Sequence, residues 1–265
     1  MIITESEPLG ARVEDVDPTH LTDEDVQRLT ELLAAQGVVV FPGQRLDDAE
    51  FTAFLGRFGR LVFTTGETPV PDHPDLNVIS NVGRTTAPRS TFHVDSSYFA
   101  APPAYTALRT VTVPRAGGQT EFTNQYRAYE TLDPELQERL AGLTLTHVVT
   151  GVELSADDES SAVHPLLRRH PVSGRVALYL TTPSRCASIS GLDETQTREL
   201  VAQLYAHSTR ADNVHRHAWA EHDVVMWDNG CVLHRADHSG VVGDRVMHRG
   251  MATGYATAVG AGLAG

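Results

Sequence analysis

The sequence predicts a mainly β protein with surrounding helices, in which an antiparallel sandwich or jelly roll forms the core. From about Asn77 onwards, short runs rich in β-branched and aromatic residues follow one another in quick succession. Turn signals such as the Ala-Gly-Gly sequence at 116–118 separate these runs, and helical patterns interrupt the series without alternating strictly with it. Such a succession favours antiparallel sheets over the parallel sheet of repeated β-α-β units.

The N-terminal part predicts a helix, a strand and a second helix. Thr22 and Asp25 begin a capping-box pattern, and apolar residues then recur at helical spacing until Gly37 ends the helix. The β-branched run at 38–41 predicts a strand, and the apolar spacing over 47–58 predicts the second helix.

Six later runs are strand candidates. They cover residues 105–113, 143–149, 176–180, 214–219, 224–227 and 245–253. Two further helices are expected, one with Asp133 as its cap and Pro134 at its first position, the other over about 194–207. The polar stretch 152–162 predicts a surface loop and is a candidate lid over a binding site.

The chain is expected to form a single domain, because its 265 residues suit one large domain and show neither an internal repeat nor a linker. Within it, we expect an N-terminal α/β cap over about 1–76 and the β core, with helical insertions, over about 77–255. The last residues, 256–265, are small and Gly-rich and predict a flexible tail.

Composition disfavours several classes of function. The 21 Lys and Arg residues against 34 Asp and Glu give a net charge of -13, which repels nucleic acid and anionic membrane surfaces. No run approaches the roughly 18 apolar residues of a membrane span, and the first residues lack the pattern of a signal peptide. The two cysteines, Cys186 and Cys231, are too few for a disulfide framework or a thiolate zinc site. We therefore expect a cytoplasmic protein that binds neither nucleic acid nor membrane.

A candidate metal site begins in the sequence FHVD at 92–95. On a strand, side chains two residues apart project from the same face, so the imidazole of His93 and the carboxylate of Asp95 would point towards one position. Two protein ligands rarely suffice for a metal ion, so a third is expected from elsewhere. The candidate is His234, which follows an apolar run ending in the sequence WDN at 227–229 and a short turn.

Four segments carry a more specific signal. They read GVVVFPGQRLDDAEFTAFLGRFGRL, TFHVDSSYFAAPPAYTALRTVTVPRAGGQTEF, HPVSGRVALYL and VVMWDNGCVLHRADHSGVVGDRVMHRG. In this order they resemble the taurine dioxygenase family of Fe(II)/2-oxoglutarate oxygenases, which also includes phenoxyacetate-herbicide dioxygenases. The likeness runs from about Gly10 to Tyr255. It implies that the core is a double-stranded β-helix, a form of jelly roll, and that the chain is an Fe(II)- and 2-oxoglutarate-dependent dioxygenase.

The resemblance assigns roles to five residues. It implies that His93, Asp95 and His234 bind Fe(II) as a facial triad, which leaves three metal sites open for 2-oxoglutarate and O2. In this family, the arginine eleven residues after the distal histidine binds the far carboxylate of 2-oxoglutarate, and that position here is Arg245 (245 − 234 = 11). A threonine in the family's GG-x-T turn bonds the same carboxylate, and it corresponds to Thr120.

The resemblance also implies a small anionic organic substrate. Arg249 matches the family's arginine that holds the anionic group, and on a strand it would share a face with Arg245. Further candidate substrate-binding residues are Arg89, Ser184 and Arg185. Taurine itself is not expected, because residues 85–91 differ from the substrate-contacting segment of the taurine enzyme and Phe92 replaces its tryptophan.

The implied reaction couples the oxidative decarboxylation of 2-oxoglutarate, which yields succinate and CO2, to hydroxylation of an unactivated C–H bond. Desaturation, epoxidation or cyclisation at the same iron site remain open, because the outcome depends on the pose of the substrate. Asp95 disfavours halogenation, since halogenating relatives lack this carboxylate. A non-catalytic sensor of 2-oxoglutarate or metal is the alternative of another class, and the intact triad argues against it. By resemblance, a homodimer or homotetramer is expected.

Overall fold

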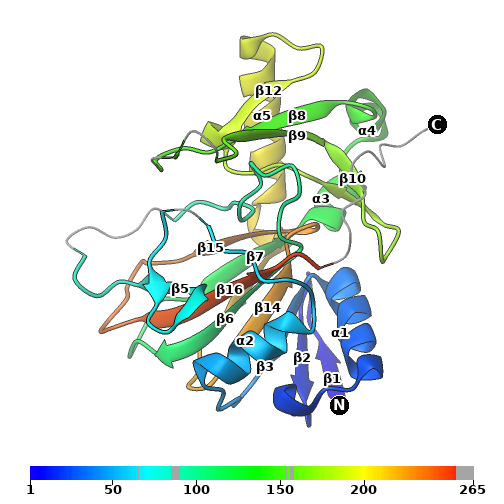
Figure 1. The fold of residues 1–265 in the computed structure, drawn as a ribbon. Helices are drawn as coiled ribbons and strands as arrows, with labels where there is room; N and C mark the ends of the chain where they lie inside the picture. The colour runs from blue at the N-terminus through cyan, green and yellow to red at the C-terminus, as the bar shows by residue number, and fades with distance from the viewer. Residues whose placement is uncertain (65, 85–89, 153, 156–157, 255–265) are drawn as a thin grey trace.

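The computed structural model describes residues 1–64, 66–84, 90–152, 154–155 and 158–254. Within these residues, a large and a smaller β-sheet pack on each other around an apolar core, and the two N-terminal helices pack on the outer face of the large sheet over a second apolar cluster (Figure 1). The prediction of a mainly β protein with a sandwich-like core and surrounding helices is confirmed.

Eight strands form the main sheet. In spatial order they are β1 (Ile2–Glu5), β2 (Ala11–Glu14), β3 (Val38–Phe41), β14 (Val224–Asp228), β6 (Tyr105–Thr112), β16 (Val246–Ala252), β5 (His73–Ser80) and β4 (Pro69–Val70). Neighbouring strands are antiparallel except β2 and β3, which are parallel. Because β1, β2 and β3 extend the sheet that later strands complete, the N-terminal segment and the rest of the chain share one sheet. The division into a cap and a core stays a prediction.

The second sheet has β7 at its centre, and two small sheets lie further along the chain. The second sheet contains β13 (Val214–His217), β7 (Thr120–Asn124) and β15 (Val232–Ala236); the small sheets contain β12 (Cys186–Ile189), β8 (Thr144–Val148) and β9 (Ser161–Pro165), and β10 (Leu167–Arg169) and β11 (Val176–Leu178). The helices are α1 (Asp23–Gln36), α2 (Asp48–Gly56), α3 (Gln125–Glu130), α4 (Pro134–Leu140) and α5 (Glu194–Ser208), with 3-10 turns η1 (Pro18–His20), η2 (Pro183–Arg185) and η3 (Ala211–Asn213). None of these described helices is long and apolar enough to span a bilayer.

Local side-chain chemistry explains where the longer helices begin and end. In α1, Thr22 accepts a hydrogen bond from the backbone N–H of Asp25, and the Asp25 carboxylate accepts one from the N–H of Thr22. Equivalent capping boxes are Asp47 with Glu50 in α2 and Asp193 with Gln196 in α5. Helix α1 ends at Gly37, which has a φ of 71° and donates its N–H to the carbonyl of Leu33 at 2.7 Å.

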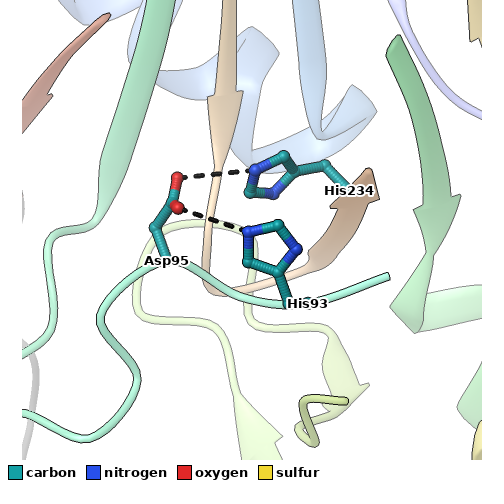
Figure 2. A group of neighbouring side chains, drawn as sticks. All are labelled: His93, Asp95 and His234. Atoms are coloured by element: carbon teal, nitrogen blue, oxygen red, sulfur yellow. Dashed lines mark ion pairs between the residues drawn. The ribbon is translucent and has the colours of Figure 1, made fainter. Parts of the chain in front are cut away.

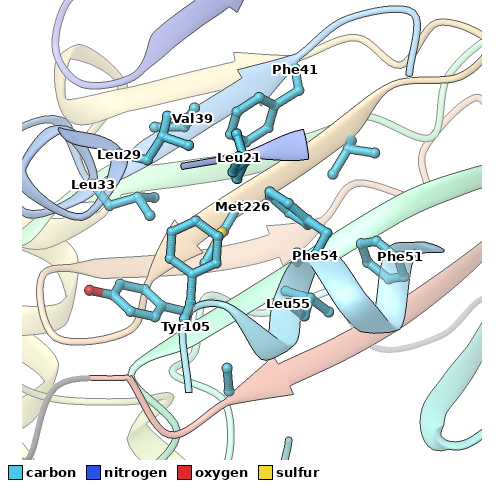
Figure 3. Close-up of a cluster of buried hydrophobic side chains, with 14 of the residues drawn as sticks. Leu21, Leu29, Leu33, Val39, Phe41, Phe51, Phe54, Leu55, Tyr105 and Met226 are labelled. Carbon is cyan, nitrogen blue, oxygen red and sulfur yellow. The ribbon is translucent and has the colours of Figure 1, made fainter. Parts of the chain in front are cut away.

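Successive side chains of the central strands point to opposite faces of the main sheet, and both faces are apolar. On one face, Val39 of β3 and Met226 of β14 pack with side chains from α1 and α2 (Figure 3). On the other face, Val38 of β3 and Trp227 of β14 pack against Phe122 of β7 in the second sheet. Each such side chain contributes about 1.5–3 kcal/mol when fully buried. The two sheets are thereby held together beside β7 and β15, and β15 carries the candidate ligand His234.

Several local predictions differ from the structure. Strands β1 and β2 were not expected, because each has only four residues and the exposed positions of β2 carry charged side chains. Helix α3 was also missed, since its six residues are too few to show a helical period. The polar loop expected over 152–162 ends earlier, because β9 begins at Ser161 and pairs with β8. Residues 153 and 156–157 of that loop, and the expected tail at 256–265, lie outside the described residues.

Candidate functional site

Two backbone hydrogen bonds bring two predicted metal ligands together. The N–H of His93 donates to the carbonyl of His234 at 3.0 Å, and the N–H of His234 donates to the carbonyl of His93 at 2.9 Å. His234 lies on β15, whereas His93 makes only this isolated bridge and a turn begins at Asp95. The prediction of a regular strand through His93 and Asp95 is therefore wrong, although both side chains still reach one position.

The side chains of His93, Asp95 and His234 point towards one another (Figure 2). Their ligand atoms all lie within 4.8 Å of one another, and the Nε2 atom of each histidine lies 3.6 Å from a different oxygen of the Asp95 carboxylate. The side chain of His93 is 30% exposed, whereas those of His234 and Asp95 are 8% and 5% exposed. Two imidazoles and one carboxylate, open to a cavity on one side, are the donor set of a non-haem Fe(II) centre.

The surroundings keep these donors in the protonation states that a metal requires. Burial lowers the pKa of His234 to about 3, so its imidazole is neutral at pH 7. Burial by itself would raise the pKa of Asp95, but its basic neighbours His234 and Arg249 outweigh that effect and hold the pKa well below its usual range. Nδ1 of His93 lies 2.9 Å from the carbonyl of Thr91, so the proton resides on Nδ1 and Nε2 offers its lone pair.

A hydrogen-bonded chain orients the Asp95 carboxylate. The hydroxyl of Thr106 donates to Oδ2 of Asp95 at 2.9 Å, and Nη1 of Arg249 donates to Oδ1 at 3.3 Å. The amide of Asn229 donates to the Thr106 hydroxyl at 2.9 Å and to the carbonyl of Pro103 at 3.2 Å. Thr106 and Asn229 were not predicted as site residues, because only the tertiary fold places β6 and the turn after β14 beside the triad.

A buried guanidinium lies in the predicted anion site. Arg245 is 1% exposed, and it donates from Nε to the carbonyl of Gly118 at 2.9 Å and from Nη2 to Oγ1 of Thr120 at 3.3 Å. Nε1 of Trp219 donates to the same Oγ1 at 3.0 Å, so the hydroxyl proton of Thr120 remains available for an anion. Among the described residues, no carboxylate lies within ion-pair distance of Arg245. Burial lowers the pKa of Arg245 to about 10, so the side chain is charged at pH 7.

Strand pairing sets the spacing between Thr120, which contacts this guanidinium, and His234 of the triad. Phe122 of β7 lies opposite His234 of β15, and Thr120 lies opposite Ala236. Thr120 and Phe122 are two residues apart on one strand face, which corresponds to about 7 Å. This span is comparable to the length of an extended five-carbon dicarboxylate. The donor set and the unpaired cation therefore fit Fe(II) and 2-oxoglutarate.

Two adjoining cavities give access to the triad. The smaller one, of about 140 Å³, is lined by His93, Asp95 and Arg249, and the larger one, of about 500 Å³, is lined by His93 and Ser184. Arg185 lines both cavities. The structure thus places Arg249, Ser184 and Arg185 around the same space, whereas Arg89 lies outside the described residues.

Glu67 is a residue of the smaller cavity that was not predicted from the sequence. It lies just before β4, and its Oε1 is 3.2 Å from Nη2 of Arg249. No motif surrounds Glu67, and its position depends on the path of the preceding loop, so the sequence contains no signal for it. Arg249 therefore lies between two carboxylates, those of Asp95 and Glu67.

A second group of possible ligands has a different character. His170, Asp228 and Cys231 also bring their ligand atoms within 4.8 Å of one another. However, Nδ1 of His170 accepts hydrogen bonds from the N–H groups of Val172 and Ser173, so Nε2 carries the proton and donates to Asp228 at 3.0 Å. Burial raises the pKa of the Cys231 thiol well above its usual value. This group is a buried hydrogen-bonded network, because neither His170 nor Cys231 offers a metal-binding lone pair in these forms.

Sequence comparison gives matches over nearly the whole chain. The family model described as "Taurine catabolism dioxygenase TauD, TfdA family" matches residues 3–251. An alpha-ketoglutarate-dependent 2,4-dichlorophenoxyacetate dioxygenase of Cupriavidus pinatubonensis is 33% identical over 270 residues, which cover 91% of this chain and 93% of that protein. A pentalenolactone F synthase of Streptomyces arenae is 31% identical, over 85% of this chain and 84% of that protein.

Solved structures match the fold as well. A taurine dioxygenase from Burkholderia xenovorans has a TM-score of 0.81 and 31% identity, over 95% of this chain and 91% of that chain. AAD-2, solved in complex with Mn(II) and N-oxalylglycine, has a TM-score of 0.84 and 26% identity, over 96% of this chain and 97% of that chain. The double-stranded β-helix implied by the resemblance is therefore confirmed.

Proposed function

Because this chain belongs to the TauD, TfdA family of α-ketoglutarate (2-oxoglutarate)-dependent dioxygenases, we propose that it oxidises a C–H bond of a small anionic substrate. Hydroxylation is the expected outcome, with consumption of O2 and 2-oxoglutarate and release of succinate and CO2. The observation that carries the proposal is the position of the His93, Asp95 and His234 side chains next to the buried Arg245, which has no carboxylate partner among the described residues.

In this proposal, His93 and His234 would hold Fe(II) through their Nε2 atoms, and Asp95 would hold it through its carboxylate. The bound iron supplies a redox-active Lewis acid at which O2 is reduced and the substrate is oxidised. Thr106 and Arg249 keep the carboxylate in one orientation, because each donates a hydrogen bond to a different oxygen. The side of the triad that faces the cavity would be left to small molecules.

Arg245 and Thr120 bind the far carboxylate of 2-oxoglutarate. The planar guanidinium supplies N–H groups in a fork that matches two carboxylate oxygens, and the hydroxyl of Thr120 supplies a further donor. The buried position of Arg245 strengthens this pairing, since little water screens the charges. The pairing also fixes the direction in which the keto acid reaches the metal.

The substrate occupies the cavity side. Arg249 binds its anionic group and holds the reactive C–H bond beside the metal. Arg185 and Ser184 contact the part of the substrate that extends into the larger cavity, and Arg89 is a further candidate. Relatives named for 2,4-dichlorophenoxyacetate and for sulfonates support an anionic substrate.

The first test is to add Fe(II) and 2-oxoglutarate to the anaerobic protein and record the visible spectrum. We expect a weak charge-transfer band that requires both additions. His234→Ala should abolish the band, and the surface substitution His20→Ala should leave it unchanged. A folded protein that gives no band would contradict the proposal, and a band without succinate formation for any candidate substrate would favour a sensor.

A further inference from the structure

Resting on the function proposed above, we propose that the substrate is an acidic amino acid whose ammonium group binds Glu67 and whose two anionic groups bind Arg249 and Arg185. The anionic groups are carboxylates or chemically similar sulfonates or phosphonates. The inference specifies a zwitterion with a net charge of −1, where the proposed function requires only a small anion.

The charges in the smaller cavity support this class of ligand. Besides the ligands His93 and Asp95, the charged side chains that line it in the described part of the chain are Glu67, Arg185 and Arg249. Two cations and one anion give a net charge of +1 (2 − 1 = +1). A ligand with two anionic groups and one ammonium group complements this arrangement group by group, and it leaves no buried charge unpaired.

The position of Glu67 favours an ammonium group next to an anionic group. Oε1 of Glu67 is 3.2 Å from Nη2 of Arg249, and the Glu67 side chain is 36% exposed to the cavity and solvent. Among the described residues, no hydrogen bond reaches Oε2 of Glu67. A carboxylate can accept about four hydrogen bonds, so Glu67 can bind Arg249 and an ammonium group together. The close pairing of Glu67 and Arg249 matches the ammonium and carboxylate that share one carbon in an α-amino acid.

Glu67 also disfavours simple anions. An anionic group bound to Arg249 would lie close to the Glu67 carboxylate, and two like charges at this distance repel each other. An ammonium group on the same ligand offsets that repulsion. Glu67 therefore discriminates between amino acids and anions without an amino group through both attraction and repulsion.

Arg185 lies where a second anionic group would reach. Its Nε donates to Oγ1 of Thr150 at 3.1 Å, which holds the guanidinium at the junction of the two cavities. The guanidinium has five N–H donors, so others remain for a ligand. A side chain that extends from Arg249 towards the larger cavity would place its terminal anionic group near Arg185.

The experiment uses the anaerobic protein loaded with Fe(II) and 2-oxoglutarate, and it follows both the visible band and the heat of binding. The probes are L-aspartate, L-glutamate and L-cysteate, with L-asparagine and L-glutamine as analogues that have one anionic group. N-acetyl-L-aspartate and N-acetyl-L-glutamate are analogues without an ammonium group. We expect at least one acidic amino acid to shift the band, and its N-acetyl analogue to bind about 10- to 100-fold more weakly.

Two substitutions test which residue binds the ammonium group of the ligand and which binds its second anionic group. In Glu67→Gln, the preference for the free amino acid over its N-acetyl analogue should fall at least about tenfold, because the carboxylate that binds the ammonium group is absent. In Arg185→Gln, the preference for L-aspartate or L-glutamate over the corresponding amide should fall instead. Glu221→Gln, an equal change of charge at an exposed position, should change neither preference.

The outcomes separate this inference from the proposed function. A band that forms but responds to none of the acidic amino acids would overturn the inference and leave the proposed function intact. An unchanged amino-acid preference in Glu67→Gln would also overturn it, because a purely structural Glu67–Arg249 pair predicts equal loss for both analogues. Absence of the band itself would instead contradict the proposed function.

Discussion

The hydroxyl of Thr106 links the Asp95 carboxylate to the amide of Asn229, so three side chains from separate parts of the chain share two hydrogen bonds of 2.9 Å. Such partners orient a metal-binding carboxylate and tune its affinity for the ion. Thr106 is completely buried, so solvent does not compete for its hydroxyl. The binding of iron is therefore expected to depend on a residue that does not touch the metal.

We predict that Thr106→Val lowers the affinity for Fe(II) by about tenfold or more, because Asp95 loses a hydrogen bond that fixes one oxygen. The affinity is measured by anaerobic titration of Fe(II). Thr110→Val is the matched control, since Thr110 lies on the same strand and is buried, and its hydroxyl has no hydrogen-bond partner in the described region. Equal affinities of the two variants would refute the role of Thr106.

We predict that Arg245→Ala weakens 2-oxoglutarate binding by about 10- to 100-fold, because the far carboxylate loses a charge-assisted pair in a buried site. Arg245→Lys should give an intermediate loss, since it keeps the charge without the planar fork. The band intensity against 2-oxoglutarate concentration measures both effects.

Arg249→Ala should behave differently from Arg245→Ala. It removes the proposed partner of the substrate anion, so substrate-triggered turnover should fall while the 2-oxoglutarate requirement changes little. Because Arg249 also contacts Asp95, Fe(II) affinity must be measured in the same variant. If 2-oxoglutarate binding is lost equally in Arg249→Ala and Arg245→Ala, the two roles are misassigned.

At the level of elements, β16 and the residue before it place binding residues on one face of the sheet and a structural contact on the other. Arg245 and Arg249 face the second sheet and the cavity, whereas His248 between them faces α2 and lies 2.6 Å from Oδ1 of Asp48. The shared face of Arg245 and Arg249 was predicted from the sequence, and the contacts confirm it. Arg245 was predicted to lie within the strand, however, whereas β16 begins at Val246.

Helices and strands that depend on neighbouring residues could be predicted from the sequence. Contacts between residues far apart in the sequence could not. Helix α1 begins after Thr22 and ends before Gly37 as expected, because a capping box and a glycine act through neighbouring residues. The prediction of a strand through Asp95 was wrong, since His93 and His234 form one isolated bridge and no continuous strand pairing. Glu67 was missed for a similar reason, because its partner Arg249 is far away in sequence.

The turn that carries Thr120 provides a prediction at this scale. Gly118 has a φ of 73°, and a Cβ atom there would lie 3.0 Å from both Cδ of Arg245 and Cγ of Pro114. Gly118→Ala should therefore weaken 2-oxoglutarate binding and lower the free energy of unfolding by about 1 kcal/mol or more. Gly142→Ala, with a φ of 76° and open space around it, should show only the loss of stability. Unchanged 2-oxoglutarate binding in Gly118→Ala would contradict the tight contact with Arg245.

Across the whole molecule, buried histidines link stability to pH. Burial, and to a smaller extent the neighbouring His164, lowers the pKa of His147 from 6.5 to about 3. The His147 ring stacks on Tyr179, with the ring centroids 5.4 Å apart. Between these pH values the unfolded chain binds a proton that the folded chain does not. The contribution of His147 is thus fully present above pH 6.5 and decreases as the pH falls towards 3.

We predict that His147→Phe, which keeps the aromatic stack, removes part of this pH dependence. The free energy of unfolding of the unsubstituted protein should fall faster than that of the variant, by about 1.4 kcal/mol per pH unit within the window. Denaturant unfolding at a series of pH values measures the difference. His20→Phe, at an exposed position, is the control. Parallel curves for His147→Phe and the unsubstituted protein would exclude this role.

The backbone bridge between His93 and His234 also concerns the order of folding. The two residues are 141 positions apart (234 − 93 = 141), so a large loop must close before their N–H and carbonyl groups can pair. Contacts of such long sequence separation form slowly, whereas helices such as α1 form from local contacts. In an unfolded or partly folded chain, the three ligands are consequently not yet close together. Uptake of iron during refolding should then follow the appearance of helical circular dichroism, and it would report that the chain has reached its native topology.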